Sequence, residues 1–323
     1  MTDTRSDAAG QLQRAAAQRL VPQPARRRRF RIDEQAILGY SFLLPAILIL
    51  AVLVGYPALA AFWYSFHNKM IGWPKVDFVG LRNYATLFGG DWRVGKALLR
   101  SFAYAGIAVS FKLPIGLAVA MLLNRRFRGR GLVRGVVLLP WALPMMASVL
   151  IWSWMYNDMF GVFNFLLMKS GLISAPLNFL GDGKLAFPAV LLTNVWRGFP
   201  FFAINLLAGL ASIPNELYEA ARVDGASRLQ AFRHITLPGV KTVAMIICLL
   251  SFIWTSNDFT TFWVLTKGGP GTATEIFPVA TYKIAFIGLE LGKGAAVSVA
   301  IMPFMSVLIV LLTKAVSRQE LER

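Results

Sequence analysis

Two groups of polar residues lie inside apolar stretches of the sequence, at spacings that place each group on one side of a helix. The first group is spaced i, i+3, i+4 and i+7, and it consists of Ser251, Trp254, Thr255 and Asp258. A helix of 3.6 residues per turn presents such positions on one face. An indole ring can lie against the C–H face of a sugar, while hydroxyls and a carboxylate can hydrogen-bond its hydroxyl groups. This face therefore predicts a site for a small polyhydroxylated solute.

The second group has similar spacing and consists of Asn194, Arg197, Gly198 and Phe201. Gly198 permits a ligand or another helix to approach the backbone closely. The charges of Arg197 and Asp258 admit two interpretations, which can also hold together. They contact a solute, or they neutralise each other between packed helices, because a buried charge needs a partner. Lys112 also lies deep in an apolar stretch, and the sequence offers it no evident acidic partner.

The sequence carries no signature of catalysis. It contains no phosphate-binding P-loop, no paired nucleophile and base, and no cluster of metal-ligating residues. His67 and His234 stand far apart without acidic or thiol companions at ligand spacing. Cys248 is the single cysteine, so a disulfide framework is impossible. We expect a protein that is not an enzyme and that binds no cofactor or metal of its own.

Composition indicates a membrane protein. Of the 323 residues, 56% are hydrophobic, and the mean hydropathy is +0.57. The net charge of +17 is concentrated beside apolar blocks, in the arm around Arg26–Arg31 and in the loop Arg125–Arg134. Basic residues at the ends of apolar segments follow the positive-inside rule, so they do not indicate a nucleic-acid partner.

Six segments have the length of about 20 residues that a membrane span needs, and they are Ile37–Phe62, Leu98–Leu123, Gly135–Tyr156, Phe187–Leu210, Thr242–Leu265 and Gly294–Val316. Residues 1–36 are polar and basic and lack the apolar core of a signal peptide, which predicts a disordered cytoplasmic arm. Residues 37–316 then form one transmembrane domain, and residues 317–323 form a short cytoplasmic tail. Several spans contain proline, which favours a transporter, although kinked packing accounts for any single proline.

The short loops predict the orientation. The loop Asn124–Arg134 holds five arginines and no acidic residue, so we expect it in the cytoplasm. Counting spans in both directions places the loop 211–241 and both termini on the same side. The segments 63–97, 157–186 and 266–293 then face outward.

The cytoplasmic segment Pro214–Pro238 reads as two short helices joined by a turn. Pro214 suits a first helical position, and early carboxylates complement the helix dipole. Gly225 can adopt the positive φ of a helix C-cap, and Ser227 can cap the second helix. A small apolar face on the first helix suits a groove in another protein.

This segment carries a family resemblance. Glu219-Ala220-Ala221, then Gly225 after three residues, then Ile235-x-Leu237-Pro238 after nine more, resemble the EAA loop of ABC-importer permeases. The resemblance implies that the first helix docks into a cleft of an ATP-binding subunit. The implied coupling residues are Glu219, Ala220, Ala221, Asp224, Gly225, Ile235, Leu237 and Pro238. A helix lying on the membrane surface is the alternative, although it ordinarily carries bulkier apolar residues.

Two further stretches extend the resemblance. Phe78–Tyr84 reads FVGLRNY and Leu265–Pro270 reads LTKGGP, and both are similar to signatures of carbohydrate permeases related to the MalF subunit of the maltose system. The resemblance implies an all-α membrane protein with six transmembrane helices and the type I ABC importer permease fold, in its short form. Positions matching both polar groups line the transport pocket in such permeases. The residue types at these positions differ in this sequence, so the resemblance does not identify the solute.

The same resemblance implies the partners. They are a second, MalG-like permease, two ATP-binding subunits that hold ATP and Mg²⁺, and a soluble or lipid-anchored substrate-binding protein. The location is the inner or cell membrane of a bacterium or archaeon. We expect the chain to form half of the translocation pathway of an ATP-driven sugar importer. One alternative solute is glycerol-3-phosphate or another anion, because Arg197 can meet a phosphate. A secondary transporter driven by an ion gradient is the alternative from a different class, but it ordinarily shows internal repeats and more midplane carboxylates.

Overall fold

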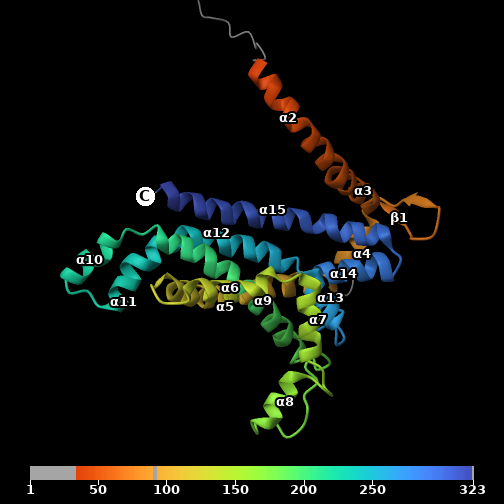
Figure 1. Ribbon diagram of the computed structural model, residues 1–323. Helices are drawn as coiled ribbons and strands as arrows, with labels where there is room; N and C mark the ends of the chain where they lie inside the picture. The colour runs from red at the N-terminus through yellow and green to blue at the C-terminus, as the bar shows by residue number, and fades with distance from the viewer. Residues whose placement is uncertain (1–33, 90–92, 322–323) are drawn as a thin grey trace, which may run out of the picture. The chain divides into compact units, whose positions relative to one another are not determined.

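The first helical segment is long and continuous, and its apolar side chains are exposed. The computed structural model describes residues 34–89 and 93–321, which divide into two units, 1–57 and 58–323 (Figure 1). The first unit holds α2 (Glu34–Leu50) and η1 (Ala51–Gly55), a π-helical turn. The predicted arm, residues 1–36, lies outside the described residues except for its last three, which begin α2. Exposed side chains such as Phe42 suit contact with lipid or with another subunit.

Helix α3 (Tyr56–Ser65) starts with the last two residues of the first unit, and the second unit contains the rest of α3 from Ala58 on and a small hairpin. Strand β1 (His67–Lys69) pairs antiparallel with β2 (Val76–Phe78), and α4 (Arg82–Phe88) follows. Asn83 joins these parts, because its amide donates to the carbonyls of Ser65 at 2.9 Å and of His67 at 3.0 Å. In this fold the FVGLRNY stretch therefore connects α4 to the end of α3 and to β1 through Asn83. The hairpin is a small departure from the all-α prediction.

Three long helices pack side by side and form most of the buried interior of the second unit (Figure 1). They are α5 (Arg93–Asn124), α9 (Ala186–Ala211) and α12 (Leu237–Ser256). Gly116 allows α5 and α9 to approach closely, because a Cβ atom there would lie 2.4 Å from the Cβ of Phe202. The predicted span Phe187–Leu210 agrees with α9 to within one residue at each end.

Two predicted spans are not single straight helices. The third consists of α6 (Arg130–Ala142) and α7 (Met145–Met155), which are bent by 90°. The bend falls at Leu143 and Pro144, where both residues have extended backbone, as the clash of proline with the preceding residue favours. The fifth is broken at Asn257 and Asp258, after which α13 (Phe259–Thr266) begins. Outside the segment Pro214–Pro238, the further helices are α8 (Val162–Lys169), α14 (Phe277–Tyr282), the π-helical turn η3 (Lys283–Ile287) and α15 (Leu291–Leu321).

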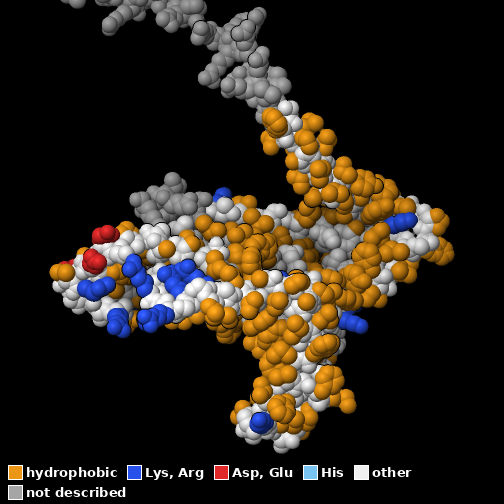
Figure 2. All heavy atoms as spheres, viewed as in Figure 1, with side chains coloured by type: hydrophobic (Ala, Val, Ile, Leu, Met, Phe, Trp, Pro, Cys, Tyr) orange, Lys and Arg blue, Asp and Glu red, His pale blue; other side chains and the backbone are white. Residues whose placement is uncertain are grey.

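Within the described ranges, four helices are long and apolar enough to cross a membrane, or five if the bent pair counts as one span. The predicted sixth span, Gly294–Val316, lies within α15. The part of α15 from Leu291 to Val307 is apolar but shorter than the four candidate spans. The fold is thus mostly helical with several candidate spans, and the number six stays a prediction. Figure 2 shows hydrophobic side chains over the long helices, and exposed examples are Leu99, Leu132 and Trp154.

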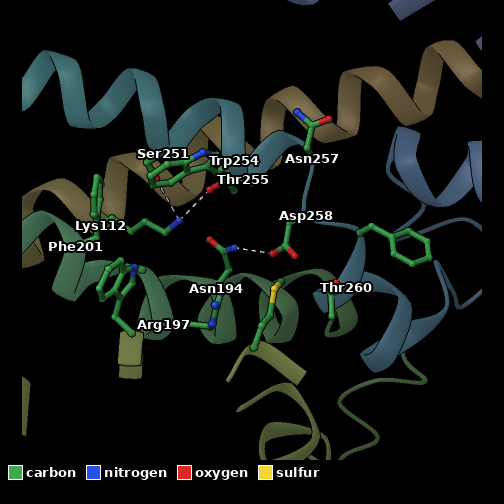
Figure 3. A pocket seen from close by; sticks show the side chains of 14 residues that line it. Lys112, Asn194, Arg197, Phe201, Ser251, Trp254, Thr255, Asn257, Asp258 and Thr260 are labelled. Atoms are coloured by element: carbon green, nitrogen blue, oxygen red, sulfur yellow. Dashed lines mark hydrogen bonds between the residues drawn. The ribbon is translucent and has the colours of Figure 1, made fainter. Parts of the chain in front are cut away.

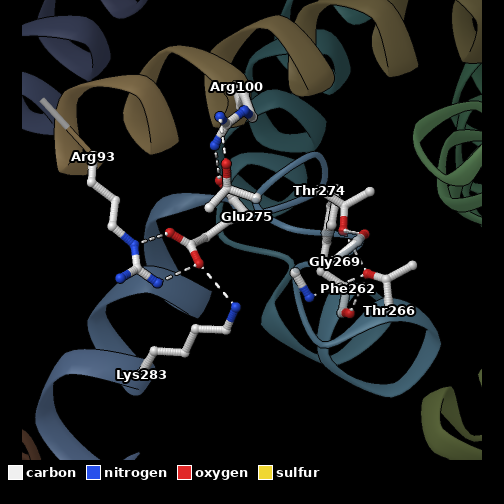
Figure 4. Close-up of polar contacts among 10 residues, drawn as sticks. Arg93, Arg100, Phe262, Thr266, Gly269, Thr274, Glu275 and Lys283 are labelled. Atoms are coloured by element: carbon white, nitrogen blue, oxygen red, sulfur yellow. Dashed lines mark hydrogen bonds and ion pairs between the residues drawn. The ribbon is translucent and has the colours of Figure 1, made fainter. Parts of the chain in front are cut away.

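The segment between α13 and α14 is held by charged contacts to α5 (Figure 4). The carboxylate of Glu275 is completely buried and accepts from Arg93 Nε at 2.7 Å, Arg93 Nη2 at 2.8 Å and Lys283 Nζ at 2.9 Å. Arg100 Nη1 donates to the backbone carbonyl of Glu275 at 3.0 Å. Buried charges are tolerated where they are paired in this way. The contacts fasten the loop that carries the GGP sequence to the first turns of α5.

Candidate functional site

A cavity of about 410 Å³ lies between α5, α9, α12 and the start of α13, and it contains both predicted polar groups (Figure 3). All eight residues of those groups line it. Six further residues line it that the sequence did not single out as a site, and they are Lys112, Trp141, Met145, Asn257, Phe259 and Thr260. A concave site with a few convergent polar groups is the usual form of a small-molecule site.

The break in the fifth predicted span changes how Asp258 reaches the cavity. Ser251, Trp254 and Thr255 belong to α12, whereas Asp258 is the N-cap residue of α13. The prediction that all four share one helical face is therefore wrong at Asp258. The backbone leaves the helix at Asn257, so the carboxylate turns toward α9 instead of continuing the α12 face.

Asp258 is engaged on both of its oxygens. Its Oδ2 accepts from the Asn194 side-chain amide at 2.8 Å, and its Oδ1 accepts from the backbone N–H of Thr261 at 3.2 Å. The second contact caps α13, where a carboxylate also complements the helix dipole. Among the described residues no hydrogen bond or ion pair joins Asp258 to Arg197. Mutual neutralisation of these two side chains by direct contact is thus absent from this structure.

Lys112 projects from α5 into the same cavity, with a side chain that is almost fully buried. Its ammonium donates to Thr255 Oγ1 at 3.0 Å and more weakly to Ser251 Oγ at 3.5 Å. The aliphatic part of Lys112 lies against Gly198, where a Cβ atom would be 2.5 Å from Lys112 Cε. The close approach that the sequence predicted at Gly198 is therefore made by a side chain of this protein. Only the position of Lys112 within an apolar stretch could have signalled this role.

Aromatic rings form another part of the cavity wall. Trp254 packs edge-on against Phe201 with ring centroids 5.3 Å apart, and the rings of Phe201 and Trp141 stack with centroids 6.5 Å apart and planes inclined by 29°. Trp254 keeps 56% of its surface exposed. An exposed indole beside hydroxyl, amide and charged groups can bind the C–H face of a sugar while its polar neighbours bind the hydroxyls.

The predicted coupling segment consists of α10 (Asn215–Val223), a turn, α11 (Arg228–Ala231) and the π-helical turn η2 (Phe232–Thr236). Gly225 has φ +78°, as a left-handed helix end requires. Ser227 caps α11 in a capping box with Gln230, because each side chain bonds the other residue's backbone N–H. The conformations of Gly225 and Ser227 are as predicted, but Pro214 is the N-cap of α10 and not its first residue. The second helix is not short and does not stop before the next span at Pro238, because it continues through η2 into α12 as one helix, Arg228–Ser256.

The outer surface of α10 is open. Glu219 and Ala220 are exposed, and Val223 is 88% exposed. Tyr218 anchors the opposite side through a hydrogen bond of 3.0 Å between its hydroxyl and Thr236 Oγ1. Figure 2 shows basic and acidic side chains near this end of the unit. The helix is thus held from behind and leaves Glu219 free to meet another molecule.

The predicted coupling residues do not form one surface. Ala221 and Ile235 line a groove of about 250 Å³ between α10, α11 and η2. Leu237 and Pro238 line a separate apolar groove with residues of α5 and α9. Asp224 and Gly225 lie in the exposed turn. In this structure the first half of the segment makes the exposed helix, and the second half joins it to α12.

The described residues include no group of three or more His, Cys, Asp or Glu that can hold a metal ion. The expectation that the chain uses no metal or cofactor stays a prediction.

Comparison with known proteins identifies the class. Residues 112–319 match the family described as the inner membrane component of binding-protein-dependent transport systems. The chain belongs to this family and is the permease component of an ABC importer. It is a membrane protein of a family whose members are transport subunits, which confirms the resemblance that the sequence showed.

Two relatives illustrate the likeness. The trehalose/maltose transport system permease protein MalF of Thermococcus litoralis is 38% identical over 82% of this chain and 88% of its own length. The inner membrane ABC transporter permease protein YcjO of Escherichia coli is 35% identical over 85% of this chain and 92% of its own. The name of the first of these relatives thus specifies the transport of sugars.

The fold has solved counterparts. A bacterial ABC transporter involved in the import of the acidic polysaccharide alginate matches with a TM-score of 0.76 and 22% identity, over 88% of this chain and 96% of that one. The MetNI methionine ABC transporter matches with a TM-score of 0.52 and 17% identity, over 70% and 96%. At these identities the likeness shows the fold alone.

Proposed function

We propose that this chain is the MalF-like permease subunit of a carbohydrate importer and forms half of its translocation pathway. The observation that carries the proposal is the cavity, in which eight residues from two apolar stretches meet around an exposed indole. Its volume of about 410 Å³ is within the range of small-molecule sites. The trehalose/maltose relative, which is 38% identical, supports a sugar as the solute.

The proposal includes six membrane spans with both termini in the cytoplasm. The bent pair α6 and α7 supplies the third span, and α15, with 31 residues, has the length for the sixth. The arginine-rich loop 124–134 and α10 then lie on the cytoplasmic side.

Coupling to ATP hydrolysis takes place through α10. Its exposed Glu219 and Val223 dock into a cleft of an ATP-binding subunit, where ATP and Mg²⁺ are held. Closure of the two ATP-binding subunits moves α10 and, through Tyr218 and Thr236, the start of α12. Because α12 lines the cavity, the motion alternately exposes the cavity to the two sides of the membrane.

The partners follow from this mechanism. A second, MalG-like permease supplies the other half of the pathway, and two ATP-binding subunits supply the energy. A soluble or lipid-anchored binding protein delivers the solute, as the family description and the alginate transporter structure with its bound periplasmic protein suggest.

Affinity purification of the tagged chain from its native membranes tests the assembly. We expect the wild type to retain an ATP-binding subunit and a second permease, and Glu219→Lys to lose the ATP-binding subunit only. Glu290→Lys, which changes a partly exposed acid paired with Lys293 in the predicted outer segment, is the control for charge reversal elsewhere and should retain all subunits. Purification of the chain alone would contradict the importer assembly, and an undisturbed complex in Glu219→Lys would contradict the role of Glu219.

A further inference from the structure

The cavity contains more positive than negative charge. Lys112 and Arg197 contribute two cations, and Asp258 is the one carboxylate among its lining residues. Both oxygens of Asp258 are already occupied, by the Asn194 amide and by the N–H of Thr261. The carboxylate therefore supports the α12–α13 break. Among the described residues it forms no ion pair with either cation, and its single negative charge offsets only one of the two positive charges.

Lys112 is the more constrained of the two cations. It is 3% exposed, and its hydrogen-bond partners, Thr255 and Ser251, are both neutral hydroxyls. Within the described ranges no acidic side chain forms an ion pair with it. A buried ammonium at membrane depth is costly unless a counter-charge approaches it. The hydroxyls orient the ammonium but do not neutralise it.

Arg197 adds an unsatisfied donor to the same cavity. Its Nε is buried without a hydrogen-bond partner among the described residues. A guanidinium presents its N–H groups in a planar fork that fits a carboxylate or phosphate, whereas an ammonium acts as a point charge. Figure 3 shows Lys112 reaching toward Ser251 and Thr255, with Asn194 between it and Arg197 in this view.

We propose that Lys112 and Arg197 form an anion subsite in the cavity, so that the transported carbohydrate carries a carboxylate or a comparable acidic group. The acidic group lies between the two cations, and the neutral face of the sugar ring lies on Trp254. This inference rests on the proposed carbohydrate function, and it adds to it the chemical class of the solute. It also gives Lys112 a specificity-determining role.

The charge of the cavity can be measured without knowing the solute, because the chain has one cysteine. Cys248→Ser removes it, and Asn257→Cys places a single thiol at an exposed position of the cavity wall. The thiol is reacted in membrane vesicles that contain the whole complex. The probes are two methanethiosulfonates of similar size, one anionic with a sulfonate and one cationic with a trimethylammonium group. Each rate is divided by the rate of the same reagent with 2-mercaptoethanol.

We expect the anionic reagent to be favoured about tenfold at this thiol, because a nearby unit charge in a part-buried site changes a local concentration by about that factor. Lys112→Met should reduce the preference several-fold, and Lys112→Arg should preserve it. Lys96→Met, which removes an exposed lysine of the same helix, is the control and should leave it unchanged. Arg197→Gln gives a second test if Lys112→Met does not assemble.

Protection by sugars completes the test. Glucuronate should slow the reaction of the thiol at lower concentration than glucose, and Lys112→Met should abolish the difference. Equal normalised rates for both reagents, or a preference unaffected by both variants, would overturn the anion subsite and leave the carbohydrate function standing. A clear anionic preference without protection by either sugar would keep a positively charged cavity but refute a sugar acid as its solute.

Discussion

Removing the charge of Glu275 should destabilise the protein measurably. In Glu275→Gln the side chain keeps its size, but Arg93 and Lys283 lose the carboxylate that both of them contact. The new amide also directs a donor toward a cation. Because the Glu275 side chain is completely buried, water cannot replace the lost acceptor at that position.

The expected magnitude follows from the exposure of the partners. Removing one member of a fully buried ion pair costs about 3–5 kcal/mol. The Arg93 and Lys283 side chains are 45% and 22% exposed, so they recover part of their hydration. We therefore expect a loss of about 2–3 kcal/mol, at or just below the lower limit of that range. For a chain of this length this corresponds to a decrease of the apparent unfolding temperature by about 3–5 °C.

The pH dependence gives a separate check. Burial of the carboxyl raises the pKa of Glu275, but the hydrogen bonds from Arg93 and Lys283 and their charges outweigh burial and leave the pKa below its ordinary value of 4.5. A folded-state pKa below the unfolded one contributes stability that is complete above about 4.5. This stability is lost as the pH falls through the folded-state pKa. The difference between the wild type and Glu275→Gln should therefore begin to shrink as the pH falls below about 4.5, and it should vanish below the folded-state pKa.

Thermal unfolding of the purified protein in detergent, followed between pH 4 and pH 8, measures both effects. Glu290→Gln is the matched control, because Glu290 pairs with Lys293 on the surface and such pairs contribute little. Equal unfolding temperatures for the two variants at pH 7 would refute the reasoning. A difference that persists unchanged at pH 4 would refute the electrostatic cause.

Three further predictions concern the cavity, the turn and the helix packing. Trp254→Ala should reduce sugar uptake about tenfold, as expected for the loss of a ring contact, while the purified complex stays intact; loss of the complex would make Trp254 a packing residue. Gly225→Asp should abolish uptake without unfolding the chain, because φ is +78° there and the position is open to solvent and to a partner, and normal uptake would remove Gly225 from the mechanism. Gly116→Val should lower the unfolding temperature, because its Cβ would meet Phe202 at 2.4 Å and overpacking costs about 1–3 kcal/mol, whereas an unchanged temperature would show that α5 and α9 separate easily.

Features with local causes could be predicted from the sequence. The bounds of α9 follow from the length of one apolar block, and the turn after α10 follows from the conformations open to Gly225 and the capping group of Ser227. The eight cavity residues could be identified because polar side chains are rare inside apolar segments, and the residues at helical spacing from them complete one face. Each of these inferences depends on a short stretch of chain.

Features that depend on contacts between distant segments could not be predicted. The break after α12 involves Asn194 of α9, which lies 64 residues before Asp258 and bonds its carboxylate, although the cap by Asp258 on Thr261 is itself local. The partners of Lys112 come from α12, about 140 residues further along the chain. The same holds for Glu275, whose partner Arg93 is 182 residues away.

Relatives that carry other solutes should differ from this chain at Lys112 more readily than at Asp258. Asp258 ends one helix and starts the next, so its replacement by a residue that cannot cap would disturb the backbone of the pathway. Lys112 comes from an uninterrupted helix, and its exchange for a neutral residue alters only the charge and size of the space beside it. The broken helix thus separates the part of the wall that must be kept from the part that can vary. A permease with this arrangement can change its solute specificity through single substitutions while its backbone fold is preserved.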